Sequence, residues 1–240
     1  MKRSLVMGCL IGVVLTGCYS PPFEQTELVS VENVSPETVS WNFQQQIAPA
    51  FESEERLVFR VFLGWKKIAV LGLTRLDRED RTLEALCLNH LGVSLFHIKG
   101  TPDETKLRYG LPEFKKHKKF PLAVGTDIRR ICFDLVPAEN AKVIAKPKRI
   151  IFRQKQDGGI LEYVFGGPNV LLLEKRFFNK CFFGRKLRWK VQYFEYQEKD
   201  DYVYPRGIVL YNRKNHYRLI AQRRKIIFDT ERAQNREAQP

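Results

Sequence analysis

The chain has 240 residues, with 41 Lys and Arg against 27 Asp and Glu, which gives a formal net charge of +14. Hydrophobic residues make up 44% of it, which is enough to build a core and excludes a disordered chain. No internal run approaches the roughly 20 apolar residues of a spanning helix, so a polytopic membrane protein is excluded. The length favours one domain, and the charge predicts an anionic partner: nucleic acid, phospholipid head groups or an acidic protein.

The N-terminus has the pattern of an export signal. A basic n-region, Lys2 and Arg3, precedes an apolar h-region from Leu5 to Leu15 that is too short to span a bilayer. The segment ends in Leu15-Thr16-Gly17-Cys18, which resembles a bacterial lipobox. We therefore expect signal cleavage between Gly17 and Cys18. The alternative is an ordinary secretory signal with an incidental cysteine.

Lipid attachment at Cys18 would anchor the chain stably, because lipoproteins of this type carry several acyl chains such as palmitate. Tyr19 follows the cysteine, and by resemblance to the enterobacterial sorting rule a residue other than Asp here favours the outer membrane. We expect a lipid-anchored protein at the periplasmic face of the outer membrane. An exported chain rarely meets nucleic acid, so lipid head groups or an acidic protein become the expected partners.

Removal of the signal leaves 39 basic against 27 acidic side chains and takes Cys9 with it. With Cys18 modified, an odd number of cysteines remains, Cys87, Cys132 and Cys181, which excludes a full disulfide framework. Two interpretations remain: one disulfide bridge, or buried free thiols.

We divide the chain into a signal peptide at 1–17, a lipidated tether at 18–34, a folded domain at 35–228 and a polar tail at 229–240. The domain opens with a predicted helix at 36–48, capped by Ser35 and ended by Pro49.

Strand-like runs with turn signals between them dominate the rest of the domain. The predicted strands are Leu57–Leu63, Lys67–Leu76, Leu83–Asn89, Val93–Lys99, Arg149–Arg153, Ile160–Phe165, Val170–Phe178, Lys186–Tyr196, Gly207–Asn212 and Tyr217–Phe228. In the middle, Thr126 is expected to cap a second helix that ends at Pro137 and whose apolar face includes Ile128 and Ile131.

So many antiparallel strands must curl, and two amphipathic helices must bury their apolar faces. We therefore predict a mainly β fold: an incomplete, half-closed antiparallel barrel with a helical lid over a hydrophobic cavity. Six residues on inward-facing strand positions are candidates for the cavity wall: Leu57, Phe59, Val61, Leu63, Trp189 and Val191.

A basic run separates the two sets of strands, with Lys115, Lys116, Lys118 and Lys119 flanking His117. In an exported protein it could attract lipid head groups or an acidic partner, or it could be a solvated loop.

The sequence contains no pattern that predicts catalysis or a bound metal. It has no Gly-x-Ser-x-Gly turn, no HExxH or CxxC pair, no P-loop and no GxGxxG. Its four histidines are not spaced as metal ligands. We expect no enzyme activity, no metal and no cofactor.

Three segments resemble the bacterial lipoprotein-localisation factors, closest to the outer-membrane acceptor family LolB within the LolA–LolB-like carriers. They are the N-terminal helix with Trp41 and three glutamines, the run Leu86-Cys87-Leu88-Asn89-His90-Leu91-Gly92, and the strand Arg188-Trp189-Lys190-Val191-Gln192-Tyr193. The match spans roughly residues 35–228, and His90 replaces the proline of the family's turn.

This resemblance implies an eleven-stranded half-barrel whose cavity receives the acyl chains of lipoproteins from a periplasmic carrier. It also implies that Leu91, on an exposed turn, acts in lipoprotein insertion; a leucine turned into the core is the alternative. We expect a monomer. We expect lipoprotein localisation as the function. A lipid- or glycolipid-binding envelope accessory without transfer is the alternative, and a structural or enzymatic lipoprotein is a third possibility.

Overall fold

The structure is a computed structural model that describes residues 21–61, 66–181 and 184–228. The expected cleavage site at Gly17 and Cys18, the tail at 229–240 and the predicted wall residue Leu63 lie outside the described residues. None of the described helices is long and apolar enough to cross a bilayer.

One antiparallel sheet contains all the described strands. Its twelve strands follow the order β5-β4-β3-β2-β1-β12-β11-β10-β9-β8-β7-β6. The bounds are β1 Ala50–Val61, β2 Lys66–Asp77, β3 Thr82–Leu88, β4 Ser94–Gly100, β5 Thr105–Gly110, β6 Lys142–Lys146, β7 Arg149–Gln156, β8 Gly159–Gly166, β9 Leu171–Cys181, β10 Gly184–Lys199, β11 Tyr202–Asn212 and β12 Tyr217–Phe228.

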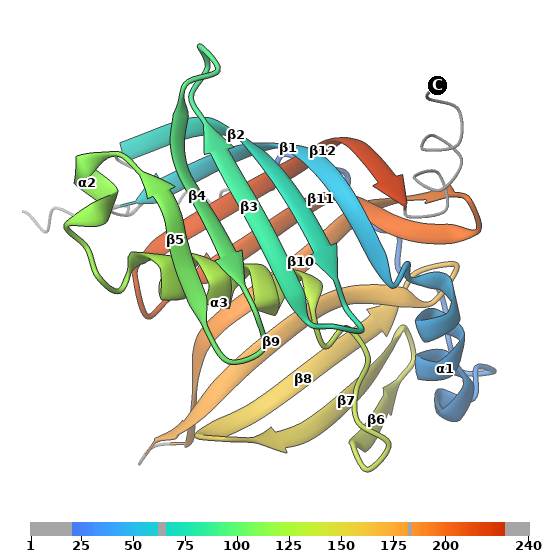
Figure 1. Cartoon of the computed structure of the whole chain (residues 1–240). Helices are drawn as coiled ribbons and strands as arrows, with labels where there is room; N and C mark the ends of the chain where they lie inside the picture. The colour runs from blue at the N-terminus through green and yellow to red at the C-terminus, as the bar shows by residue number, and fades with distance from the viewer. Residues whose placement is uncertain (1–20, 62–65, 182–183, 229–240) are drawn as a thin grey trace, which may run out of the picture.

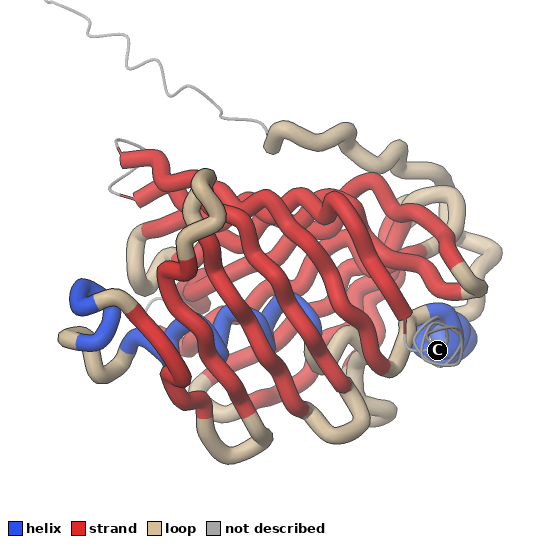
Figure 2. Tube along the Cα trace, turned by 45° about the horizontal axis from the view of Figure 1, so that its top comes forward, coloured by secondary structure: helices blue, strands red, loops and turns tan. Residues whose placement is uncertain are grey.

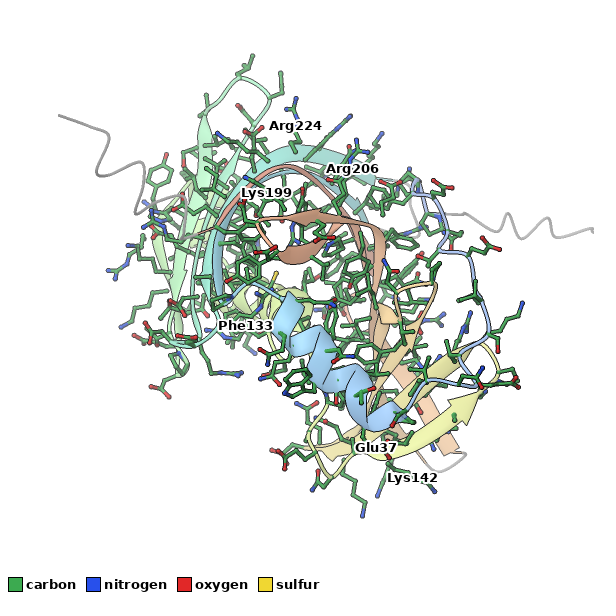
Figure 3. All side chains as sticks on the ribbon, turned by 90° about the vertical axis from the view of Figure 1, so that its right-hand side faces the viewer. Glu37, Phe133, Lys142, Lys199, Arg206 and Arg224 are labelled. Atoms are coloured by element: carbon green, nitrogen blue, oxygen red, sulfur yellow. The ribbon has the colours of Figure 1, made fainter. Side chains whose placement is uncertain are left out.

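The sheet bends strongly but does not close, so β5 and β6 remain its two edges. The described residues include three helices beside it: α1 Pro36–Gln46, α2 Pro112–Lys115 and α3 Phe120–Cys132. Figure 1 shows α3 inside the curve of the sheet, and Figure 2 shows it passing beneath the strands. Figure 3 shows α1 lying across the concave side at one end. The predicted half-barrel with a helical lid is confirmed.

The sheet has more strands than the ten or eleven that were expected, because the short edge strands β5 and β6 lack a long apolar run. The central helix also differs from its prediction. It begins at Phe120, with Pro121 in its first turn, and Thr126 lies in its interior, where its hydroxyl donates to the Leu122 carbonyl. Proline suits a first turn, and the helix therefore begins six residues before the expected cap and ends at Cys132, before Pro137.

The strands end at two different sides of the molecule, which we name by the helix found there. The α2 end carries the β1–β2, β3–β4, β7–β8, β9–β10 and β11–β12 connections and the segment with α2 (left in Figure 1). The α1 end carries the remaining hairpins and α1.

Side chains from the sheet hold the C-terminus of α3 in place. Lys175 donates to the carbonyls of Arg130 (3.1 Å) and Phe133 (2.7 Å). The Tyr193 hydroxyl donates to the Ile131 carbonyl at 2.9 Å, and Arg78 Nε donates to the Cys132 carbonyl at 2.9 Å. The last carbonyls of a helix have no partner within it, and cations near them also favour the negative end of its dipole.

The interior is filled at the α1 end. There the guanidinium groups of Arg78 and Arg223 lie over the ring of Phe51, at 5.3 and 5.0 Å from its centroid. Phe43 of α1 packs edge-to-face on Phe165, with ring centroids 5.5 Å apart. This end therefore provides much of the aromatic and cation–π packing of the core.

The described part of the expected tether packs on the outer face of the sheet. Phe23 stacks on Phe194 at 5.6 Å and is buried together with Val209 and Ile220. Further along, the Val31 N–H donates to the Pro147 carbonyl at 2.8 Å, at the α1 end. Residues 21–31 therefore run from the middle of the outer face toward the α1 end (Figure 2).

The buried Lys175 gives a pH-dependent test of this anchoring. Burial lowers the pKa of Lys175 from 10.5 to about 8, so between these values the unfolded chain binds more protons than the folded one. The free energy of unfolding of the wild type, relative to Lys175→Met, should therefore rise by roughly 1–2 kcal/mol between about pH 7.5 and 9.5. Urea unfolding at the two pH values measures this difference, and a flat or falling difference would contradict it.

Candidate functional site: an apolar cavity beneath helix α3

A cavity of about 270 Å³ lies between α3 and the concave face of the sheet. Strands β1, β2, β3, β4, β11 and β12 provide its floor, and α3 provides its roof. The floor includes Leu57, Phe59, Ala85, Cys87, Leu219 and Ala221. Val124, Ile128 and Ile131 line it from the helix. The cavity wall is therefore mainly apolar.

Both carboxylates at the cavity wall have partners. Glu55 accepts from Arg223 Nε at 3.1 Å. Asp127 accepts from Arg130 at 2.7 Å and from the Asn212 amide at 3.4 Å. Burial raises the pKa of Asp127, while Arg130 and Asn212 oppose that rise. Because each carboxylate is engaged by the protein, the wall favours an apolar occupant.

Two of the three remaining cysteines, Cys87 and Cys132, also face this cavity, and all three are free thiols. Burial raises the pKa of Cys87 to about 12 and raises that of Cys132 as well. Both thiols are therefore protonated at neutral pH and act as small apolar groups, since the thiolate is the reactive form. Cys181, which we expected to be buried, is exposed at the end of β9.

The cavity is displaced toward the α2 end of the sheet. On β1 it extends to Phe59, two residues before the strand ends, and on β12 it includes the first residue, Tyr217. At the other end, the side chains around Phe51 and Arg78 leave a space of only about 20 Å³. The interior is thus hollow on one side and filled on the other.

Three phenylalanines hold the N-terminus of α3 at the hollow end. Phe96 of β4, Phe114 of α2 and Phe120 of α3 contact one another with centroid distances of 4.9–5.3 Å. Two of them, Phe96 and Phe120, also line the cavity. Apolar contacts of this kind are less directional than the hydrogen bonds at the helix C-terminus, so this end of α3 can yield to a ligand more easily.

The predicted wall residues fall into three groups. Leu57 and Phe59 line the cavity. Trp189 and Val191 are buried in the main core beside it, with Trp189 stacked on Phe177 at 5.8 Å, and are not among the lining residues. Val61 ends β1.

Leu91 lies on the β3–β4 turn and is 75% exposed, so the alternative in which it turns into the core is wrong. Asn89 shapes this turn, because its side-chain oxygen accepts from the N–H groups of Leu91 and Val93, both at 2.9 Å. Gly92 takes a positive φ of 79° there, a conformation that favours glycine.

The four lysines of the basic run, Lys115, Lys116, Lys118 and Lys119, are exposed at the same end of the sheet. Lys115 ends α2 and lies over the Tyr109 ring at 5.9 Å. Sequence reasoning missed Lys175 and Asp127, which are buried and engage in the bonds described above. The available signal for Lys175 was a charged residue that shares one face of β9 with the apolar Phe177.

No protein-family model matches the sequence, and no curated protein matches it. Among solved structures, the chain is similar to a LolA superfamily protein from Nitrosomonas europaea, with a TM-score of 0.49 and 6% identity over 81% of this chain and 94% of that one. A candidate outer membrane lipoprotein-sorting protein domain from Vibrio parahaemolyticus gives 0.47 and 12%, over 81% and 92%. A DUF1329 family protein from Desulfovibrio piger gives 0.43 and 10%, over 80% and 91%.

These TM-scores lie below 0.5, so the proposals that follow rest on this chain's own residues and geometry.

The stability of Cys87→Phe tests whether the cavity is empty space. Adding bulk to a packed core costs roughly 1–3 kcal/mol, whereas a side chain that enters an existing hollow meets little resistance. We expect Cys87→Phe to change the free energy of unfolding by less than about 1 kcal/mol. Phe at the exposed Ala145 is the surface control. Urea unfolding measures the change. A loss of roughly 1–3 kcal/mol, as expected for an overpacked core, would contradict the prediction.

Proposed function

We propose that this protein binds acyl chains in the cavity beneath α3. The observation that carries the proposal is an apolar cavity of about 270 Å³ whose wall carboxylates are already paired. Each buried methylene contributes about 0.8 kcal/mol, so even part of an acyl chain gains several kcal/mol on entry. The volume lies near the lower limit of about 300–1,000 Å³ typical of ligand pockets, which suits one slender chain better than a bulky cofactor.

The direction of entry follows from how α3 is held. Hydrogen bonds from Lys175, Tyr193 and Arg78 fix its C-terminus, and the interior beyond them is filled. The chain would therefore enter at the α2 end, between Phe59 and the phenylalanine cluster around Phe120. The polar head group would then remain outside, at that same end.

The specific function that we propose is lipoprotein localisation at the outer membrane. In this proposal Cys18 carries the lipid anchor, the cavity accepts acyl chains of lipoproteins from a periplasmic carrier, and Leu91 assists their insertion. The exposure of Leu91 on a turn at the α2 end, where the chain would enter, supports this role. The protein would act as a monomer, without a cofactor and without catalysis.

A second function uses the same cavity: an envelope accessory that holds a lipid or glycolipid and transfers nothing. The apolar cavity wall supports this function as well as it supports lipoprotein localisation, because it does not distinguish the acyl chain of a lipoprotein from that of a phospholipid. Carrier-dependent transfer is the property that separates the two functions.

Acyl binding can be measured by displacement of a fluorescent fatty acid. Cys87→Phe should weaken binding by at least about tenfold, because the added ring takes the volume of several methylenes. Ala145→Phe, on the exposed edge strand β6, should bind as the wild type does. If Cys87→Phe is folded and binds normally, the cavity is not the binding site.

Transfer is tested by reconstitution of a labelled lipoprotein with a periplasmic carrier and this protein. Leu91→Glu should leave fatty-acid binding intact and reduce insertion of the lipoprotein into vesicles, because a charged side chain at a membrane contact is costly. Trp41→Glu, an equally abrupt change at an exposed apolar residue of the α1 end, is the control. Normal insertion by Leu91→Glu would remove its proposed role, and binding without any transfer would favour the accessory function.

A further inference from the structure

The charges of the molecule are unequally divided between the two ends of the sheet. The difference lies in the connections of the described chain, each taken with the two residues that flank it on either side. At the α2 end these segments hold 13 Lys and Arg but only two acidic residues. The hairpins of the α1 end hold eight basic and eight acidic residues. The large positive charge is therefore concentrated at one end, where the cavity lies.

The basic groups come from nearly the whole width of the sheet. Lys66 and Lys67 begin β2, Arg185 lies at the β9–β10 hairpin, and Arg213 and Lys214 form the β11–β12 turn. All five are exposed. Together with the basic run at 115–119, they form an arc that follows the left margin of Figure 1. A complementary partner must therefore be broad as well as anionic.

Apolar side chains are exposed among these charges. Of the eight large hydrophobic residues that are exposed in the described chain, Leu91, Val93 and Tyr109 lie in the α2-end segments, and Ile68 and Leu122 lie one residue beyond them. Lysines whose ammonium groups meet head groups, beside apolar side chains that enter the boundary below them, are typical of membrane-surface binding. A soluble acidic protein would match the charge but gives no reason for the scattered apolar side chains.

The N-terminal segment is compatible with the same orientation. It runs along the outer face of the sheet, and Phe23, near the start of the described chain, stacks on Phe194 and packs over Val209 and Ile220, near the middle of β10, β11 and β12. A chain that approaches from a membrane at the α2 end reaches Phe23 without crossing the domain.

We propose that the α2 end of the sheet is a docking surface for an anionic lipid bilayer, which places the cavity entrance against the head groups. Lysines near such a surface contribute about fivefold each to binding, and the attraction is screened by salt. This inference does not require that the cavity binds acyl chains, because charge and exposed apolar side chains alone would produce docking.

The first test is co-sedimentation of the full chain, carrying Cys9→Ser and Cys18→Ser, with lipid vesicles. Vesicles that contain phosphatidylglycerol should bind it, and those of phosphatidylcholine alone should bind it weakly. Binding should decline at 1 M salt, where the screening length is about 3 Å. All variants keep the same first twenty residues, so any contribution from these is common to them. Binding that is indifferent to lipid charge and to salt would overturn the proposal.

A matched pair of variants locates the surface. Lys116→Gln, Lys118→Gln and Lys119→Gln together should weaken binding to anionic vesicles by up to about a hundredfold. Lys146→Gln, Lys148→Gln and Arg149→Gln remove the same charge from exposed positions of the α1 end and should have a much smaller effect. Equal effects would show that net charge, and not this surface, is responsible.

The exposed thiol of Cys181 reports the orientation directly, since it lies at the α2 end. An environment-sensitive fluorophore on it should shift to an apolar signal when anionic vesicles are added. The same label on Asp201→Cys, in a Cys181→Ser background, marks the α1 end and should not respond. A response at residue 201 alone would overturn the proposal. So would binding to polyglutamate without binding to anionic vesicles, which would assign the surface to an acidic protein.

Fatty-acid displacement separates this proposal from the function proposed above. The triple lysine variant should bind a fluorescent fatty acid as the wild type does, and Cys87→Phe should bind anionic vesicles normally. Failure of docking with intact fatty-acid binding would overturn only the membrane surface.

Discussion

The cavity depends on the way the C-terminus of α3 is held. A helix ends with carbonyls that have no partner of their own. Here the buried Lys175 and Tyr193 and the half-buried Arg78 supply the donors. Burial makes the charged form of Lys175 costly, as its pKa of about 8 shows, and the negative end of the helix dipole offsets part of that cost. Because α3 is fixed through its end, it need not pack closely along its length, and a hollow can persist beneath it.

The fold was largely predictable because two local signals agree with it. Alternation in the strand that contains Trp189 and Val191 identified an inward face, and both residues are buried. Ser35 and Pro36 located the start of α1. The short edge strands were missed because few of their residues are buried, and the start of α3 was missed because Thr126 resembles a cap as much as an interior residue. Gly125, which suggested a break before the helix, instead lies inside it, where a Cβ would collide with Thr105.

The cavity itself was predictable only as a consequence of curvature. Leu57 and Phe59 line it because their strand bends around α3, but Trp189, on an equally apolar face, packs against Phe177 instead. Which part of an apolar concave face remains empty depends on contacts between residues far apart in the chain. The bonds of Lys175 span more than forty positions, and no local pattern encodes such pairs.

The division of the interior has a physical reason. A cavity lowers stability, because the side chains around it lose contacts, so the domain needs a well-packed region elsewhere. The α1 end provides it, with Phe51 beside two arginines and Phe43 against Phe165. Segments with fewer such contacts open at lower free energy, which places the softer part of the structure around Phe120. The basic, partly apolar surface lies at that same soft end, so contact with a bilayer there would act directly on the end of α3 that the phenylalanine cluster holds.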